Sequence, residues 1–384
     1  MKKLETITLG IETSCDETSC AILKGRDEVL SNIVSSSLAQ HQVFGGVVPE
    51  IASRHCLEAI DTVYQSALKQ SGIREKEIGL IAVTRGPGLI GSLLVGVSFA
   101  KALSFGWKVP LVGVNHLEAH LEANFIEEKK PQKSFVGLIV SGGHTALVHC
   151  SGECPPPEAG GIQSSTRPWT HHATGGWRRS VAKPSRDERG LYRLLGETVD
   201  DAVGEAYDKV AKILGLGYPG GPVIDRLAAG GDPKAVRFTK PKIDNKLDFS
   251  FSGIKTAVFY YVGKNKPLSE QAVKDLCASF QSACVEWLVE KAMAACAQTD
   301  CRALVTGGGV TANSYLRKRL AEEAQKKGVK VYIPPFKYTT DNAAMIARSG
   351  LEKFSGQGAG LDMAADPNLG IGQKEFKLAP QSAA

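Results

Sequence analysis

The sequence predicts an α/β fold of two duplicated lobes with a ligand-binding cleft between them. Two predicted β-hairpins support this, over residues 6–23 and 135–149, because each opens one half of a chain of 384 residues. Several predicted strands also run through a glycine-rich turn into a helix, an arrangement in which backbone N–H groups can bind an anion. The length favours two domains.

The composition is that of a soluble globular protein, with 43% hydrophobic and 22% charged residues. A net charge of +6 permits an acidic partner such as RNA without requiring one. Nine cysteines without a CxxC pair predict reduced thiols. We see no signal peptide and no apolar span of 18 residues, so we expect a cytoplasmic enzyme without membrane contact.

The first half begins with a hairpin whose polar connection carries Asp16. Such a turn either faces a bound phosphate or is an ordinary exposed turn. The glycine-rich residues 85–91 either bind an anion or allow close helix–strand packing. The predicted elements are strands Thr6–Glu12 and Thr18–Leu23, a helix from about Ile51 to Ser71, strand Gly79–Thr84, helix Ser92–Phe105 and strand Val109–Val114.

A histidine pair, His116 and His120, follows the last of these strands, and Asn115 is a suitable N-cap for a helix there. At this spacing both imidazoles share one helix face and can bind a metal together. Without a third ligand such a pair is more often a surface or packing feature, and the candidate third ligand is Asp341. The glutamate that zinc proteases carry directly after the first histidine is missing.

The second half opens with strands Phe135–Val140 and Ala146–His149 around a second glycine-rich turn. Residues 151–190 then break the pattern, because they hold five prolines and six glycines and show no periodic apolar face. We interpret them as a loosely ordered insertion or a local reading-frame irregularity. A solvated loop is favoured over a basic loop that contacts RNA.

Order returns after residue 190. Acids beside the glycine–proline turn at residues 218–222 form a solvated helix face or else hold ribose hydroxyls or a metal. We expect the segment from Gly356 onward to be peripheral or frayed. The predicted elements are helices Glu197–Leu214 and Leu268–Gln298, strand Ala303–Thr306, helix Ala312–Lys327, strand Val329–Ile333 and helix Ala343–Gly350, which Asp341 closely precedes.

Nine motifs together resemble the universal tRNA threonylcarbamoyladenosine transferase family, called TsaD in bacteria and once labelled a glycoprotease. The resemblance covers nearly the whole chain except residues 151–190 and the extreme C-terminus. The motifs are GIETSCDET, GGVVPEIASRH, TRGPGLIGSLLVG, NHLEAH, SGGHT, LLGETVDDAVGEAYDKVAKILGLGYPGGP, FSFSGIKTA, TGGGVTAN and TTDNAAMIA.

The resemblance implies a two-lobed fold of the actin, hexokinase and Hsp70-ATPase type, with lobes at residues 1–115 and 116–384 and an irregular insertion at about 151–190. It implies transfer of a threonylcarbamoyl group from threonylcarbamoyl-AMP to N6 of adenosine at position 37 of tRNAs that read ANN codons. The implied protein partners are a TsaB-like paralogous subunit and a TsaE-like small ATPase.

The resemblance also implies site residues. The metal, most often Fe²⁺ and alternatively Zn²⁺, would be bound by His116, His120 and Asp341. From the chemistry of the residues, and not from the resemblance, Glu12 or Asp16 is the candidate for assisting proton removal from the adenine amine. The implied substrate-binding residues are Leu138, Ile139, Val140, Ser141, Gly142, Gly143, Asp208, Gly221, Asp225 and Asn313.

Other functions stay open at this point. An actin-like kinase or ATPase would use Mg²⁺, which prefers oxygen ligands and has no need of a histidine pair. A scaffold in a tRNA-modification complex would keep the fold and tolerate loss of the metal ligands.

Overall fold

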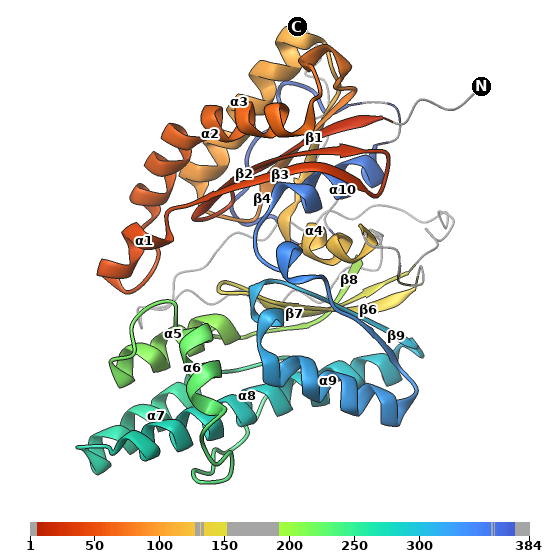
Figure 1. Cartoon of the computed structure of the whole chain (residues 1–384). Helices are drawn as coiled ribbons and strands as arrows, with labels where there is room; N and C mark the ends of the chain where they lie inside the picture. The colour runs from red at the N-terminus through yellow and green to blue at the C-terminus, as the bar shows by residue number, and fades with distance from the viewer. Residues whose placement is uncertain are drawn as a thin grey trace, which may run out of the picture.

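The computed structural model describes residues 6–126, 131, 134–151, 192–354, 356 and 358–372. Two five-stranded mixed sheets form the centres of two lobes, one above the other in Figure 1. The predicted insertion, including His171 and His172, lies outside the described residues apart from Ser151. The upper sheet contains β1 (Ile7–Glu12), β2 (Glu17–Lys24), β3 (Glu28–Ser36), β4 (Leu80–Gly86) and β5 (Leu111–Asn115), and the lower sheet contains β6 (Phe135–Val140), β7 (Thr145–Cys150), β8 (Tyr192–Glu197), β9 (Ala303–Gly307) and β10 (Lys330–Tyr332).

The two sheets have one topology. The upper sheet runs β3-β2-β1-β4-β5 and the lower runs β8-β7-β6-β9-β10, so corresponding strands occupy corresponding places. In each sheet the first three strands of the chain pair antiparallel, and the fourth and fifth join in parallel. The predicted α/β fold of duplicated lobes is therefore confirmed.

Sequence reasoning missed the same strand in each lobe. Neither β3 nor β8 was predicted, and the helix expected over Glu197–Leu214 begins only at Val203 because residues 192–197 pair with β7. Both are third strands of their sheets and carry several exposed side chains. Such strands lack the continuous apolar run that identifies a central strand.

Helices cover both faces of each sheet. In the upper lobe α2 and α3 cover one face and α10 the other, while α4 covers one face of the lower sheet and α5 and α8 the opposite face. The helices are α1 (Leu38–His41), α2 (Pro49–Ser71), α3 (Ile90–Trp107), α4 (His116–Glu122), α5 (Val203–Leu214), α6 (Gly220–Ala228), α7 (Ser252–Asn265), α8 (Glu270–Gln298), α9 (Ser314–Lys327) and α10 (Ala343–Lys353), with 3₁₀ turns η1 (Gln42–Phe44), η2 (Glu75–Glu77), η3 (Ala123–Phe125), η4 (Gly309–Ala312) and η5 (Phe336–Tyr338).

The helices α4 and α10 pack against each other between the two sheets. Although α10 belongs to the second half of the sequence, it packs on β1, β2 and β4 of the upper sheet. A division of the chain after Asn115 would separate α10 from the sheet that it covers. The predicted boundary between residues 115 and 116 stays a proposal.

Two expectations from the sequence need correction, one about α3 and one about the C-terminal residues. Among the helices of the described residues, α3 has the length and apolar composition to cross a membrane, contrary to the expectation of no such span. One such helix is weak evidence for a membrane, and one side of α3 packs on α2 and β4. Residues 358–372, which we call the C-terminal strap, are packed rather than frayed: Ala359 N donates to Leu111 O at 2.6 Å and Asp366 N donates to Arg85 O at 2.9 Å.

Substitution Gly10→Ala tests the packing of α10 on the upper sheet. An added Cβ at Gly10 would lie 2.2 Å from the Ala343 carbonyl oxygen and 2.8 Å from Ala347 N, so β1 and α10 would have to separate. We expect a loss of about 1–3 kcal/mol in the free energy of unfolding, measured by urea denaturation. Gly106→Ala is the control, because nothing lies within 4 Å of the added Cβ. Equal stability of the two variants would contradict this packing.

Candidate functional site

The histidine pair lies at the start of α4, directly after β5. The Asn115 side chain accepts hydrogen bonds from Leu117 N at 2.9 Å and Glu118 N at 3.3 Å, so the predicted N-cap is present. The His116 and His120 rings share one side of the helix, with centroids 4.7 Å apart. They are buried, with exposed fractions of 7% and 1%.

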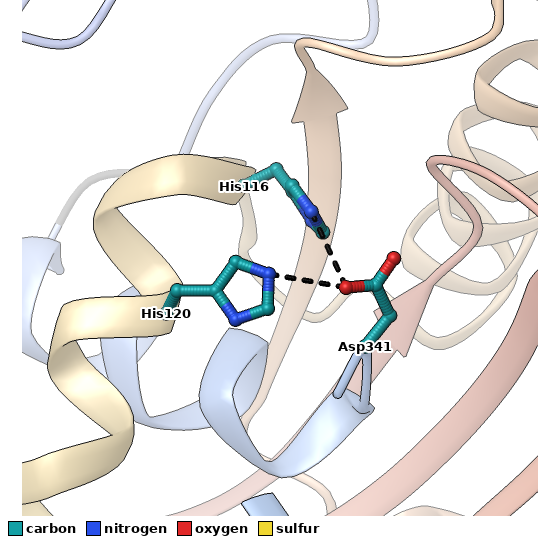
Figure 2. A group of neighbouring side chains, drawn as sticks. All are labelled: His116, His120 and Asp341. Atoms are coloured by element: carbon teal, nitrogen blue, oxygen red, sulfur yellow. Dashed lines mark ion pairs between the residues drawn. The ribbon is translucent and has the colours of Figure 1, made fainter. Parts of the chain in front are cut away.

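The third predicted ligand, Asp341, reaches the same place from the start of α10, the helix that covers the upper sheet. Asp341 lies just before α10, whose N-cap is Asn342. Its Oδ1 atom lies 3.1 Å from His120 Nε2 and 3.5 Å from His116 Nε2, as Figure 2 shows. The sequence therefore predicted a cluster that the structure contains, although 220 residues lie between His120 and Asp341 in the chain.

The geometry of these three side chains fits a metal ion. One ligand atom from each lies within 4.8 Å of the others. Among the described residues, neither ring nitrogen of the buried His120 has a hydrogen-bond partner, although Nε2 lies close to the Asp341 carboxylate. A buried imidazole without a hydrogen bond is costly, and a bound cation would offset that cost. Two imidazoles and one carboxylate suit Fe²⁺ or Zn²⁺ and do not select between them.

Glu12 lies behind His116, on the side away from Asp341. Its Oε2 atom lies 3.1 Å from His116 Nδ1, and the fully buried carboxylate also accepts from Thr84 Oγ1 at 2.5 Å and from Ser14 N at 2.6 Å. A carboxylate on Nδ1 leaves the Nε2 lone pair free toward Asp341, the usual support for a metal-binding histidine. Proton removal by Glu12 stays a prediction.

Burial and the neighbouring charges shift the pKa values of His116 and Asp341 in opposite directions. Burial alone would lower the pKa of His116, but the carboxylates of Asp341 and Glu12 outweigh it and raise that pKa to about 9. Burial would likewise raise the pKa of Asp341, but His116 and His120 hold it well below its usual range. Without a metal, the protonated His116 forms an ion pair with Asp341, and a metal cation would have to displace the imidazolium proton.

The turn of the first hairpin faces the metal cluster and also the second lobe. Burial, followed by the charges of Asp341 and Asp16, raises the pKa of Glu17 to about 10. The Asp16 charge also contributes to the raised pKa of Asp208 on α5. The structure thus brings Asp16 near residues predicted to bind substrate, and its role in proton transfer stays a prediction.

The predicted substrate segment 138–143 forms the second half of β6 and most of the turn into β7. Backbone packs closely around this turn: an added Cβ at Gly204 would lie 2.6 Å from Ser141 O, and one at Gly308 2.4 Å from Val140 O. Gly308 also has a φ of 95°, which glycine adopts readily. By contrast, no atom of the described residues lies within 4 Å of an added Cβ at Gly142 or Gly143, which leaves space beside this backbone for a ligand.

The remaining predicted substrate residues form two pairs joined by α6. Asp208 accepts from Gly220 N at 2.7 Å, beside Gly221. At the far end of α6, Asp225 accepts from Asn313 Nδ2 at 3.1 Å and from Ser314 Oγ at 2.9 Å. Asn313 in turn caps α9 through Leu316 N at 2.8 Å. Hydrogen bonds to neighbouring residues therefore hold the side chains of Asp208, Asp225 and Asn313 in place.

Sequence reasoning missed several neighbours of the metal cluster. Thr84 and Ser14 orient Glu12 and His116, and nothing in their local pattern indicates this. His144 follows the open glycines, and its position within SGGHT could have drawn notice. Burial, and then the charges of His116 and His120, lower the pKa of His144 to about 4, which places a neutral imidazole near the cluster.

Comparison with known proteins identifies the family. The family model for TsaD, tRNA N6-adenosine threonylcarbamoyltransferase, matches residues 28–154 and 185–348. The chain belongs to the TsaD family. The gap in the match falls within the predicted insertion.

Curated relatives extend this match to almost the full length. A tRNA N6-adenosine threonylcarbamoyltransferase of Dictyoglomus turgidum is 45% identical over 370 residues, covering 96% of this chain and 100% of the relative. One of Clostridium botulinum strain Kyoto is 44% identical, covering 95% and 98%. Among solved structures, full-length HypF in a phosphate- and nucleotide-bound form aligns with a TM-score of 0.55 and 13% identity, over 92% of this chain and 48% of HypF, which supports the fold alone.

Addition of metal should stabilise the protein through the His116, His120 and Asp341 cluster. At a free Zn²⁺ or Fe²⁺ concentration 100 times Kd, binding to the native state adds about 2.7 kcal/mol. We expect the melting temperature of metal-stripped protein to rise on addition of metal, and His120→Ala to abolish most of that rise. An equal rise in His120→Ala would place the bound metal elsewhere.

The Asp208 carboxyl should make stability depend on pH. Burial raises its pKa from 3.8 to about 6, so the folded state binds the proton more tightly than the unfolded state. Its contribution therefore falls as pH rises through that window. In Asp208→Asn the side-chain oxygen can still accept from Gly220 N, so we expect the variant to gain about 1–2 kcal/mol over wild type between pH 4 and pH 7, measured by urea unfolding. A constant difference would contradict the raised pKa.

Proposed function

We propose that this protein transfers a threonylcarbamoyl group from threonylcarbamoyl-AMP to N6 of adenosine 37 in tRNAs that read ANN codons. Membership of the TsaD family supports this reaction class. The observation that carries the proposal is the cluster of the buried His116 and His120 with the partly buried Asp341, near the open turn at Gly142 and Gly143. A reactive group could be held there by both lobes.

The proposed reaction forms one bond and breaks one. The adenine N6 attacks the carbamoyl carbon, the bond from that carbon to the phosphate oxygen of AMP breaks, and N6 loses a proton. An exocyclic adenine amine is a weak nucleophile, so positioning and electrostatic stabilisation must supply most of the rate. We propose Glu12 or Asp16 for the proton, and the position of Glu12 behind His116 favours Asp16, which lies in the turn between the lobes.

We propose His116, His120 and Asp341 as the ligands of one divalent metal, Fe²⁺ in first place and Zn²⁺ as the alternative. When bound, such an ion supplies Lewis acidity toward carbonyl or phosphate oxygens. Glu12 orients His116 for that role by accepting from Nδ1. Oxygen-only coordination of Mg²⁺, expected of an actin-like kinase, does not match this set.

We propose that the adenylate lies against the second lobe. Asp208 and Asp225 can accept hydrogen bonds from ribose hydroxyls, and Asn313 and Gly221 lie beside them. The backbone of residues 138–143 borders the same region and can face the phosphate or the threonyl group. Both acids already accept backbone or side-chain bonds, so their oxygens are oriented before any ligand arrives.

The proposed partners are tRNA, a TsaB-like subunit and a TsaE-like small ATPase, with the cytoplasm as the location. The net charge of +6 supports contact with an RNA backbone. Exposed apolar side chains on α2 and α3, Leu57 (67%), Leu94 (51%) and Phe105 (73%), offer a surface for a protein partner. Seven cysteines of the described residues are free thiols, as suits a reducing compartment: Cys15, Cys20, Cys56, Cys277, Cys284, Cys296 and Cys301.

Transfer of labelled threonine into an ANN-decoding tRNA tests the function. Purified protein receives threonylcarbamoyl-AMP and the partner subunits, and wild type is compared with His116→Ala and Asp341→Ala. We expect label in tRNA with wild type and a loss of about 100-fold or more in both variants, because each removes a ligand of the metal.

His149→Ala is the control, since His149 lies on β7 outside the metal cluster and should leave transfer intact. Undiminished transfer in the ligand variants would make the metal a structural ion. No transfer by wild type with competent partners would favour the scaffold role.

A further inference from the structure

The central glutamate of the motif NHLEAH has no role in the reaction as described. Glu118 lies two residues from each histidine, so on a helix it points away from the face that His116 and His120 share. It is nevertheless buried, with 5% of its surface exposed. A buried carboxylate requires partners, and both of its oxygens have one.

The two partners of Glu118 come from the end of the chain. Gly372 N, the last described residue of the C-terminal strap, donates to Glu118 Oε1 at 2.9 Å. Lys353 Nζ, on the last residue of α10, lies 2.5 Å from Oε2. One residue before α4, Asn115 Nδ2 donates to Gly370 O at 2.9 Å, so the strap holds both the cap and the body of the metal-binding helix.

We propose that Glu118 is a positioning residue of the metal site, which fixes α4 through the end of the strap and through α10. The inference rests on the proposed metal site. Asp341 precedes α10 and the histidines lie on α4, so the Glu118–Lys353 pair ties together the two helices that carry the ligands. If this tie loosens, the three ligand atoms no longer share one position and metal affinity falls.

Two glycines of the C-terminal region provide a matched test. Gly372 has a φ of 75°, and an added Cβ there would lie 2.1 Å from Tyr192 O, so Gly372→Ala would push the strap end away from Glu118. Gly356 has a φ of 94° with nothing within 4 Å of an added Cβ, so Gly356→Ala carries the same kind of backbone strain without displacing a contact.

The experiment measures the Zn²⁺ or Fe²⁺ affinity of metal-stripped full-length protein by competition with a chelator. We expect Glu118→Ala and Gly372→Ala to bind metal about tenfold more weakly than wild type, as is typical for residues that support metal ligands. Glu118→Gln should retain much of the affinity, because its amide oxygen can still accept from Gly372 N, and Gly356→Ala should match wild type.

The role of Glu118 would be overturned if Gly372→Ala and Gly356→Ala had equal metal affinity, whether both bound as tightly as wild type or both bound more weakly. If Glu118→Ala does not fold, the two glycine variants still decide, since neither changes the core. Failure of wild type to bind metal would overturn the metal site itself. Threonine transfer by wild type is then measured separately, so a wrong function and a wrong role for Glu118 give different results.

Discussion

The packing of α4 on α10 between the two sheets is the constraint on which the rest of this structure depends. Each helix covers the inner face of one sheet. The helix α4 carries His116 and His120, and Asp341 lies just before α10. Glycines allow the close approach: Gly10 meets the backbone of α10, and an added Cβ at Gly307 would lie 2.8 Å from the backbone of His120. Because backbone rather than flexible side chains sets these separations, the distance between the histidines and Asp341 is part of the fold.

Duplication of the topology explains why the site lies where it does. In both sheets a polar turn connects the two strands of the first hairpin, β1 to β2 or β6 to β7. Both turns lie close to the metal cluster. The turn after β1 brings Asp16 and Glu17 near Asp341, and the turn after β6 brings His144 near His116 and His120. Two copies of one motif thus supply different chemistry, with carboxylates from one lobe and open glycine backbone with an imidazole from the other. A transferred group between the lobes would meet both.

Charge at this position has a cost in stability. Burial, with neighbouring carboxylates, raises the pKa values of Glu17 and Asp208, while Asp341 and Glu12 raise the pKa of His116 against the effect of its burial. A divalent cation and a polar ligand would relieve much of this repulsion, as expected of a site arranged for function more than for stability. The strap and Lys353 both contact Glu118, on the opposite side of α4 from His116 and His120.

The sequence by itself determined the fold class, the hairpins, the N-cap at Asn115 and the three candidate metal ligands, because local periodicity, capping and residue chemistry are written in neighbouring positions. It could not show the strands β3 and β8, whose half-exposed faces lack a strong pattern. Nor could it show that Glu12 supports His116, that Thr84 supports Glu12, or that residues 358–372 hold α4. Those contacts join positions far apart in the chain, and only the packing of α4, α10 and the two sheets decides which distant side chains meet.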